Sequence, residues 1–262
     1  KHAKIIYMED VRKSINFGDK IVALFKGFFP RLFIAKASPD DTGVILFTSG
    51  SYGAPKGAVL SHANLVANVE QGYSHVPFEP DWSFFCPLPM FHCFGLLGGV
   101  LLPLFTGHKT FLFPSPTQVK EIPKLIKETG ANVFFATDTF AQQYARNAAD
   151  DDLKCIRLMV LGAERVKQET RDLYMRRFGV ELLEGYGATE ASPLISVNIP
   201  GKNRYGTVGQ FVPELEWRLE PVPGIDGGQK LYVRGPNVMR GYLDPLKPFG
   251  IDLTSAKNIL AA

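Results

Sequence analysis

The sequence predicts an α/β fold built on a largely parallel sheet, followed by a smaller β-rich subdomain. Short apolar runs alternate with amphipathic stretches through the middle of the chain, which is the pattern of strands joined by helices. Near residue 200 this pattern changes, and β-rich pieces separated by Gly and Pro turns follow without a good helical pattern. We therefore expect an α/β core at 1–200, incomplete at its N-terminus, a β-rich subdomain at 201–245 and an unassigned tail at 246–262.

Six apolar runs are the predicted strands of the core. Each is short, rich in β-branched or aromatic residues, and bounded by polar, Gly or Pro residues. They are 43–49, 83–89, 108–114, 131–138, 156–164 and 180–187.

Three amphipathic stretches are the predicted helices. Ser61 is placed to cap a helix over 62–73, as a hydroxyl residue does when it precedes an apolar periodic segment. The stretches 117–130 and 166–179 each end on a glycine. Glycine readily takes the left-handed conformation that closes a helix, so both helices should end there.

The composition is that of an ordinary globular protein. The chain has 262 residues, of which 45% are apolar and 21% charged, and a formal net charge of +3. No run of clustered Lys and Arg points to nucleic acid as a partner. Cys86, Cys93 and Cys155 lack metal-ligand spacing, so we expect reduced thiols in a cytoplasmic setting. The apolar run 93–105 is too short to span a bilayer.

A polar, glycine-bearing loop follows the first predicted strand and suits a polyphosphate. It combines glycines that let a ligand approach the backbone, hydroxyl groups beside backbone N–H groups, and a mobile positive charge. These residues are Thr48, Ser49, Gly50, Ser51, Gly53 and Lys56. The Walker A spacing fails, because Pro55 precedes the lysine and Gly57 follows it. We interpret the loop as a hairpin-like phosphate cradle, and a flexible surface turn stays the alternative for this loop alone.

Two further polar segments, 162–164 and 184–190, follow later predicted strands. Ligands of open α/β sheets bind beyond the carboxyl ends of the strands, so we expect all three segments at one crevice. Tyr186 can lie against a purine or a sugar, and Thr189 can hydrogen-bond a phosphate oxygen. Glu190 is a candidate Mg²⁺ ligand, since Mg²⁺ prefers hard oxygens and bridges to substrate phosphates. A capping or solvated carboxylate is the alternative for Glu190 taken alone.

The motifs together resemble the adenylate-forming family, which contains acyl-CoA synthetases, luciferases and peptide-synthetase adenylation domains. The resemblance lies in ILFTSGSYGAPKGAVLSHANL, LGAE and EGYGATEASP, and PLPMFHCFGL, FPSP, TDTF, YGTVGQFVP and VRGPNVMRGYL also follow the family order. It covers about 40–242. Within the family, the sequence is most similar to the acyl-acyl-carrier-protein synthetase parts of bacterial bifunctional 2-acylglycerophosphoethanolamine acyltransferases.

This resemblance implies the large N-terminal domain of an adenylate-forming enzyme, without its C-terminal lid domain. It implies ATP and Mg²⁺ as cofactors and a fatty carboxylate that attacks the α-phosphate of ATP. Pyrophosphate leaves, and the acyl group passes to a thiol of coenzyme A or of an acyl carrier protein. Peripheral membrane association of the full-length protein is left open. The alternative is a non-catalytic module that binds a nucleotide or acyl-adenylate, since the lid lysine is missing.

The resemblance also implies roles for individual residues. The catalytic residues are Lys56, His92, Thr189 and Glu190, with Glu190 as the metal ligand. His92 is expected beside the acyl site, where a satisfied core histidine is the alternative, and 95–105 either lines an acyl tunnel or packs in the core. The nucleotide-binding residues are Thr48, Ser49, Gly50, Ser51, Gly53, Lys56, Gly162, Ala163, Glu164, Glu184, Gly185, Tyr186, Gly187 and Thr189.

Overall fold

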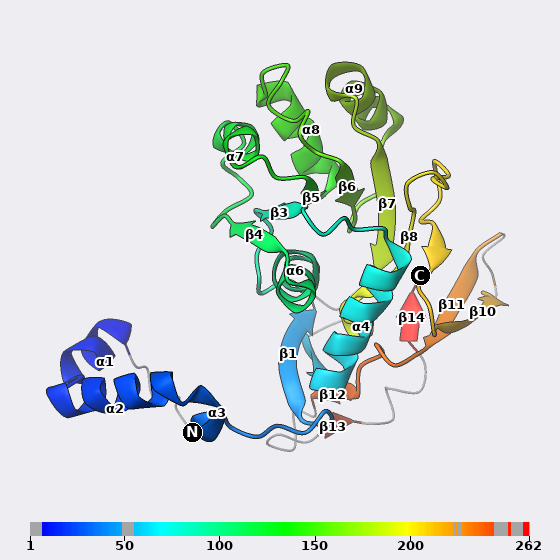
Figure 1. Ribbon diagram of the computed structural model, residues 1–262. Coiled ribbons are helices and arrows are strands. Elements are labelled where there is room, and N and C mark those ends of the chain that lie inside the picture. Colours follow the sequence, from blue (N-terminus) through cyan, green and yellow to red (C-terminus); the bar gives the residue numbers. More distant parts are fainter. Residues whose placement is uncertain are drawn as a thin grey trace. The chain divides into compact units, whose positions relative to one another are not determined.

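The computed structural model describes residues 7–48, 55–222, 224, 227–243, 251–252 and 259–261, and the chain divides into two units. The first unit, 1–38, contains three helices, α1 (Met8–Ser14), α2 (Phe17–Phe28) and α3 (Pro30–Phe33), drawn in blue in Figure 1. Asn16 begins α2, because its side chain accepts a hydrogen bond from the backbone N–H of Asp19. The second unit, 39–262, contains the sheets and all positions of the predicted site.

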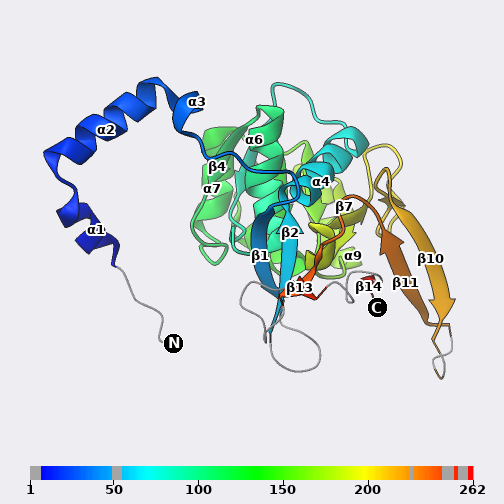
Figure 2. The same ribbon diagram turned by 90° about the horizontal axis from the view of Figure 1, so that it is seen from below.

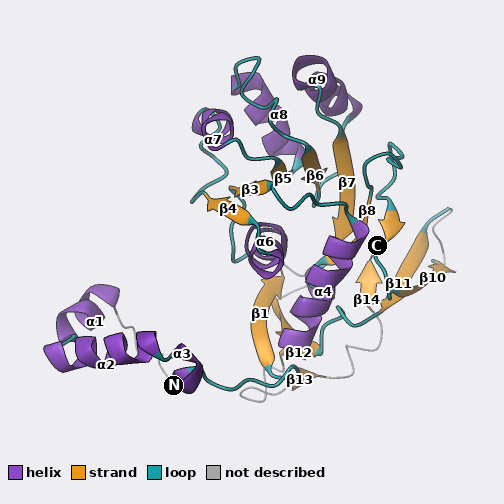
Figure 3. Ribbon diagram, in the orientation of Figure 1, coloured by secondary structure: helices purple, strands orange, loops and turns teal. Residues whose placement is uncertain are grey.

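The largest sheet has seven strands in the order β4-β3-β5-β6-β7-β8-β9 (Figure 3). Strands β3 to β7 form a parallel set, as the sequence predicts. Strands β8 and β9 are antiparallel, so the sheet is mixed at one edge. The short connection between β7 and β8 explains the reversal, since parallel neighbours need a longer crossover. The strands are β3 (Ser83–Cys86), β4 (Lys109–Leu112), β5 (Val133–Ala136), β6 (Leu158–Leu161), β7 (Leu182–Gly187), β8 (Leu194–Val197) and β9 (Gln210–Phe211).

Helices cover both faces of this sheet (Figure 1). One face is covered by α7 (Glu121–Thr129), α8 (Asp138–Asn147) and α9 (Gln168–Phe178). The other is covered by α4 (His62–His75), the short α5 (Cys93–Gly95), the π-helical turn η1 (Leu96–Leu101) and α6 (Leu102–Thr106). Side chains of a strand alternate between the two faces, so β6 contributes Met159 and Leu161 to the first core cluster and Leu158 and Val160 to the second.

The predicted helix ends are confirmed. The Ser61 side chain accepts from the backbone N–H of Asn64, and the Asn64 side chain accepts from that of Ser61, which forms a capping box at the start of α4. Gly130 closes α7 and Gly179 closes α9, both in the left-handed conformation with φ of 64° and 69°. Within the described ranges, no helix has both the length and the apolar character needed to cross a bilayer.

Two smaller antiparallel sheets complete the second unit (Figure 2). The four-stranded sheet has the order β1-β2-β12-β13, and the three-stranded sheet has the order β10-β11-β14. The first predicted strand is therefore real, but it belongs to an antiparallel hairpin and not to the parallel sheet. These strands are β1 (Thr42–Thr48), β2 (Lys56–Ser61), β10 (Glu216–Pro221), β11 (Gln229–Arg234), β12 (Gly241–Leu243), β13 (Ile251–Asp252) and β14 (Ile259–Ala261).

Candidate functional site

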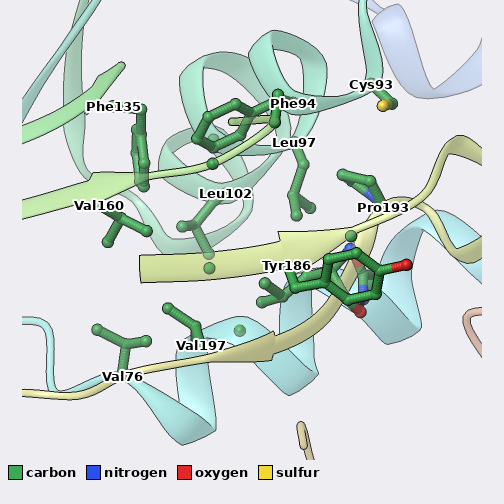
Figure 4. Close-up of a pocket in the computed structure, with 18 of the residues that line it drawn as sticks. Val76, Cys93, Phe94, Leu97, Leu102, Phe135, Val160, Tyr186, Pro193 and Val197 are labelled. Carbon is green, nitrogen blue, oxygen red and sulfur yellow. Dashed lines mark hydrogen bonds between the residues drawn. The ribbon is translucent and has the colours of Figure 1, made fainter. Parts of the chain in front are cut away.

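A mainly apolar cavity of about 790 Å³, including its open mouth, lies between the large sheet and the helices on its second face (Figure 4). Val76, Phe135 and Val160 lie toward one side of the close-up, and Cys93, Tyr186 and Pro193 lie toward the other. Much of this volume is the open mouth, and the space inside that would hold water-sized groups is about 100 Å³. The cavity is therefore a narrow, mainly apolar recess that is open to solvent.

Two of the predicted nucleotide segments meet at this cavity. Gly162 follows β6, and 185–187 ends β7, which is the parallel neighbour of β6. The carboxyl ends of adjacent parallel strands lie at the same sheet edge, which explains their proximity. A Cβ atom on Gly162 would lie 3.3 Å from the Phe94 ring, and one on Gly187 would collide with the Pro193 carbonyl. Glycine is thus required at 187, where the backbone forms the cavity wall, whereas a side chain at 162 would press against the Phe94 ring.

Two carboxylates of the predicted nucleotide set have protein partners instead of lining the cavity. Glu184 is buried, forms an ion pair with Arg171, and accepts a hydrogen bond from the Val166 N–H at 3.0 Å. Glu164 accepts from the backbone N–H and the hydroxyl of Thr139, at 3.1 and 2.7 Å, in the first turn of α8. Both side chains hold the loop after β6 against its neighbours. Sequence reasoning missed these partners because they lie 13 to 25 positions away along the chain.

His92 lies at the cavity and is exposed, which contradicts the alternative of a buried core histidine. It begins α5, and its Nδ1 accepts from the Phe94 N–H at 3.4 Å. The next residue, Cys93, is buried at the cavity wall, with Sγ 3.3 Å from the Thr189 hydroxyl. Burial raises the pKa of the Cys93 thiol, so the group is neutral at physiological pH. The sequence did not single out Cys93, although its position beside His92 was a usable signal.

The apolar run 95–105 both lines the cavity and packs in the core, so the two interpretations of this run are compatible. Leu97, Gly98 and Leu102 face the cavity, whereas a Cβ atom on Gly99 would collide with the Cys86 side chain. The glycines let the π-helical turn lie close to the sheet.

The predicted phosphate cradle is described only at its two ends. Ser49, Gly50, Ser51 and Gly53 lie outside the described residues. Thr48, at the end of β1, pairs with Lys56, at the start of β2, and its hydroxyl donates to the Lys56 carbonyl at 3.5 Å. This antiparallel pairing agrees with a hairpin and not with the strand-to-helix geometry of a P-loop.

Thr189 and Glu190 lie in a 3₁₀ turn, η2 (Thr189–Ala191), directly after β7. The phenol of Tyr242 donates to Glu190 Oε1 at 2.6 Å, and the Lys56 ammonium lies 5.2 Å from the centre of the Tyr242 ring. Burial and, to a lesser degree, the Glu190 charge raise the pKa of Tyr186. Lys56 and Glu190 are 134 positions apart in the chain, yet one lies over the ring of Tyr242 and the other accepts from its hydroxyl. Sequence reasoning did not name Tyr242.

A metal at Glu190 would have few protein ligands. Among the residues that the structure describes, no group of three or more His, Cys, Asp or Glu side chains could hold a metal ion. Mg²⁺ commonly binds through one or two carboxylates and takes its other ligands from waters and substrate phosphates. The single carboxylate at η2 therefore fits Mg²⁺ bound together with a nucleotide.

Buried amide side chains hold the segments around η2. Asn237 Nδ2 donates to the carbonyls of Ala191 and Leu194 at 2.8 and 3.1 Å, and the Ser192 hydroxyl donates to the Asn237 carbonyl at 2.8 Å. Asn64 Nδ2 donates to the carbonyls that flank Asn237, those of Pro236 and Val238. The sequence Pro236-Asn237-Val238 could have indicated this role, because an asparagine between apolar residues is often buried, and a buried amide is usually hydrogen-bonded.

The fold and the site define an α/β enzyme core in which one cavity joins a glycine-lined sheet edge to an apolar pocket. Residues 5–243 match the family model of the AMP-binding enzymes, so the chain belongs to that family. It is 32% identical over 240 residues to a long-chain-fatty-acid–CoA ligase of Escherichia coli O157:H7, covering 84% of this chain and 41% of that protein. It is 33% identical over 213 residues to "Probable 4-coumarate–CoA ligase 3" of Dictyostelium discoideum, covering 77% of this chain and 38% of that protein.

Solved structures show the same architecture. A malonyl-CoA ligase in a ternary product complex with methylmalonyl-CoA and AMP is 28% identical, with a TM-score of 0.72 over 80% of this chain and 47% of that one. ATP-bound MatB from Rhodopseudomonas palustris is also 28% identical, with a TM-score of 0.70 over 79% of this chain and 42% of that one. The chain spans about two-fifths of the length of the curated relatives described above, 41% and 38%.

Proposed function

We propose that this chain belongs to an acid–thiol ligase that activates a long-chain fatty acid with ATP. The carboxylate forms a bond to the α-phosphorus, the bond to the bridging oxygen breaks, and pyrophosphate leaves an acyl-adenylate for transfer to a thiol. The observation that carries the proposal is that one cavity is lined both by Gly162 and the glycines at the end of β7 and by apolar side chains of α5 and η1. An acyl-adenylate needs this combination, because its nucleotide and acyl parts are joined at one phosphate.

The electrostatic demand of the reaction supports the same assignment. An anionic carboxylate approaches an anionic phosphate, so catalysis depends on positioning and on groups that stabilise the developing charge. In our proposal, Lys56 supplies a positive charge to the phosphates, and the Thr189 hydroxyl donates to the α-phosphate. Glu190 holds Mg²⁺, which when bound would neutralise phosphate charge. Gly162, Ala163 and 185–187 lie beside the adenine, and the loop between β1 and β2 binds the β- and γ-phosphates. Glu164 and Glu184 act indirectly, because their protein partners hold the loop after β6.

The lining of the acyl end of the cavity favours an acid substrate with an aliphatic or aromatic tail. Its wall includes Val76, Phe78, Leu97, Leu102 and Phe135, which offer no charge to pair with a second carboxylate. The named activity of the Escherichia coli relative supports a long-chain fatty acid, and its thiol is coenzyme A. A carrier-protein thiol as acceptor rests on the sequence resemblance. The free cysteines Cys86, Cys93 and Cys155 support a reducing, cytoplasmic location.

Exchange of labelled pyrophosphate into ATP, in the protein encoded by the full reading frame, tests this proposal. Palmitate should stimulate exchange more than acetate or 4-coumarate. Lys56→Met and Glu190→Gln should each lower exchange about 100-fold or more, which is the usual loss when one group that stabilises a transition state is removed. Lys127→Met is the matched control, since Lys127 is exposed and paired with Asp151 away from the cavity.

Two results would count against it. A protein that binds ATP but shows no exchange with any of these acids would be a non-catalytic nucleotide-binding module. Equal loss in Lys127→Met and Lys56→Met would show that charge at Lys56 has no specific role. Thioester formation with coenzyme A and with a pantetheinylated carrier protein, measured side by side, then identifies the acceptor.

A further inference from the structure

Strand pairing places Tyr242 between the phosphate hairpin and η2. Tyr242 in β12 is the register partner of Ala58 in β2. Directly opposed residues share one face of a sheet, and so does a residue two positions along either strand. Lys56 is two positions before Ala58, so its side chain and the Tyr242 ring lie on one face. Ala58 has only a methyl group and is fully buried, which leaves the space above it to the tyrosine.

The other end of the same side chain reaches Glu190. The phenol donates to Oε1 at 2.6 Å, a short distance typical of a hydroxyl donor on a charged acceptor. Met239, three residues before Tyr242, donates its backbone N–H to the Glu190 carbonyl at 2.8 Å. The main chain and the side chain of Glu190 are therefore both held by the segment 239–242.

Lys56 does not replace the phenol as the partner of Glu190. Within the part of the chain that the structure describes, Lys56 and Glu190 form no ion pair, and the ammonium lies 5.2 Å from the Tyr242 ring instead. A lysine bound to Glu190 would compete with a metal for the carboxylate. A neutral phenol occupies one carboxylate oxygen, Oε1, and leaves the charge of the group intact.

We propose that Tyr242 is a positioning residue for adenylation, which orients Glu190 so that its second carboxylate oxygen meets the metal bound with the nucleotide. This inference rests on the proposed function. It assigns to Tyr242 the part that outer-shell hydrogen bonds have at metal sites, where they orient the ligating group.

Tyr242→Phe tests the inference, because it removes the hydroxyl and keeps the ring that contacts Lys56. The measurement is the Mg²⁺ concentration that gives half-maximal binding of a fluorescent ATP analogue to the protein of the full reading frame. We expect this concentration to rise about tenfold, the lower end of the usual cost of losing an outer-shell partner. Binding of the analogue in EDTA should not change, and the melting temperature should fall by only about 2–4 °C per kcal/mol lost with this one hydrogen bond. Tyr232→Phe, in β11, is the control and should leave the Mg²⁺ dependence unchanged.

Two further measurements separate positioning from a general structural effect. Pyrophosphate exchange by Tyr242→Phe should recover to near the wild-type rate at saturating Mg²⁺, which a misfolded site would not do. In a Glu190→Gln background, Tyr242→Phe should add no further shift in the Mg²⁺ dependence, because its effect passes through the carboxylate.

The outcomes distinguish this inference from the proposed function. An unchanged Mg²⁺ dependence in Tyr242→Phe, or shifts that add in the double variant, would overturn the role of Tyr242 and leave adenylation standing. A wild-type protein that binds no ATP analogue at any Mg²⁺ concentration would overturn both. A tenfold shift that high Mg²⁺ rescues supports both.

Discussion

Replacing Asn237 with alanine should destabilise the protein strongly although the residue lies outside the cavity. Asn237 is completely buried, and its amide bridges the carbonyls of Ala191 and Leu194, in η2 and at the start of β8. Alanine removes both bonds and also the longer one, 3.5 Å, that Gln71 Nε2 donates to Asn237 Oδ1. Gln71 keeps its bond to the Pro213 carbonyl. The loss therefore depends on whether each carbonyl has a second donor.

The two carbonyls differ in this respect. Leu194 also accepts from Asn68 Nδ2 at 2.9 Å, so losing the Asn237 bond costs about 1 kcal/mol, the net value of an ordinary hydrogen bond. For the Ala191 carbonyl, Asn237 is the donor found among the described residues, so alanine leaves a buried acceptor unsatisfied at about 1–3 kcal/mol. We expect a total loss of about 3 kcal/mol, including the small void left by the amide.

Urea unfolding, followed by tryptophan fluorescence, measures this loss from the shift in the midpoint. Asn147→Ala is the matched control, because Asn147 is exposed and its amide donates to the Gln143 carbonyl within α8. Its effect should stay within about 0.5 kcal/mol, as for most surface changes. A loss below about 1 kcal/mol for Asn237→Ala, or one equal to that of the control, would refute the assignment of Asn237 as the buried link.

Two other predictions concern buried charge and buried thiols. Arg171→Met should lower the free energy of unfolding by about 3–5 kcal/mol, since it leaves the Glu184 carboxylate buried without its partner. In urea unfolding, the double variant Arg171→Met/Glu184→Leu should recover much of this loss. A double variant no more stable than Arg171→Met would contradict the prediction. Burial raises the pKa of Cys86 to about 11 and that of Cys93 above its ordinary value. The thiolate is the reactive form, so iodoacetamide should label both thiols slowly at neutral pH and faster as the pH rises toward these pKa values. Equal rates in the native and the guanidinium-unfolded protein at neutral pH would show that burial does not protect them.

Local patterns predicted the parallel core well. The strands β3 to β7 and the ends of α4, α7 and α9 follow from apolar runs, a capping serine and closing glycines, all of which act over a few residues. Strand β2 was not predicted, because its six residues, KGAVLS, end on the helix cap Ser61 and carry little periodicity. The antiparallel β8 and the separate sheet of β1 were also missed, since pairing depends on distant partners.

The order and residue types of the motifs by themselves determined the family and the segments that surround the cavity. Hydroxyl-, glycine- and carboxylate-bearing loops can be read from a sequence because they follow strands directly. Only the tertiary structure decided which partner each carboxylate has within the protein. Glu184 and Glu190 are six positions apart, yet one is buried against Arg171 while the other meets Tyr242. That phenol comes from 52 residues away and is brought there by the pairing of β12 with β2, which no local pattern in the chain encodes.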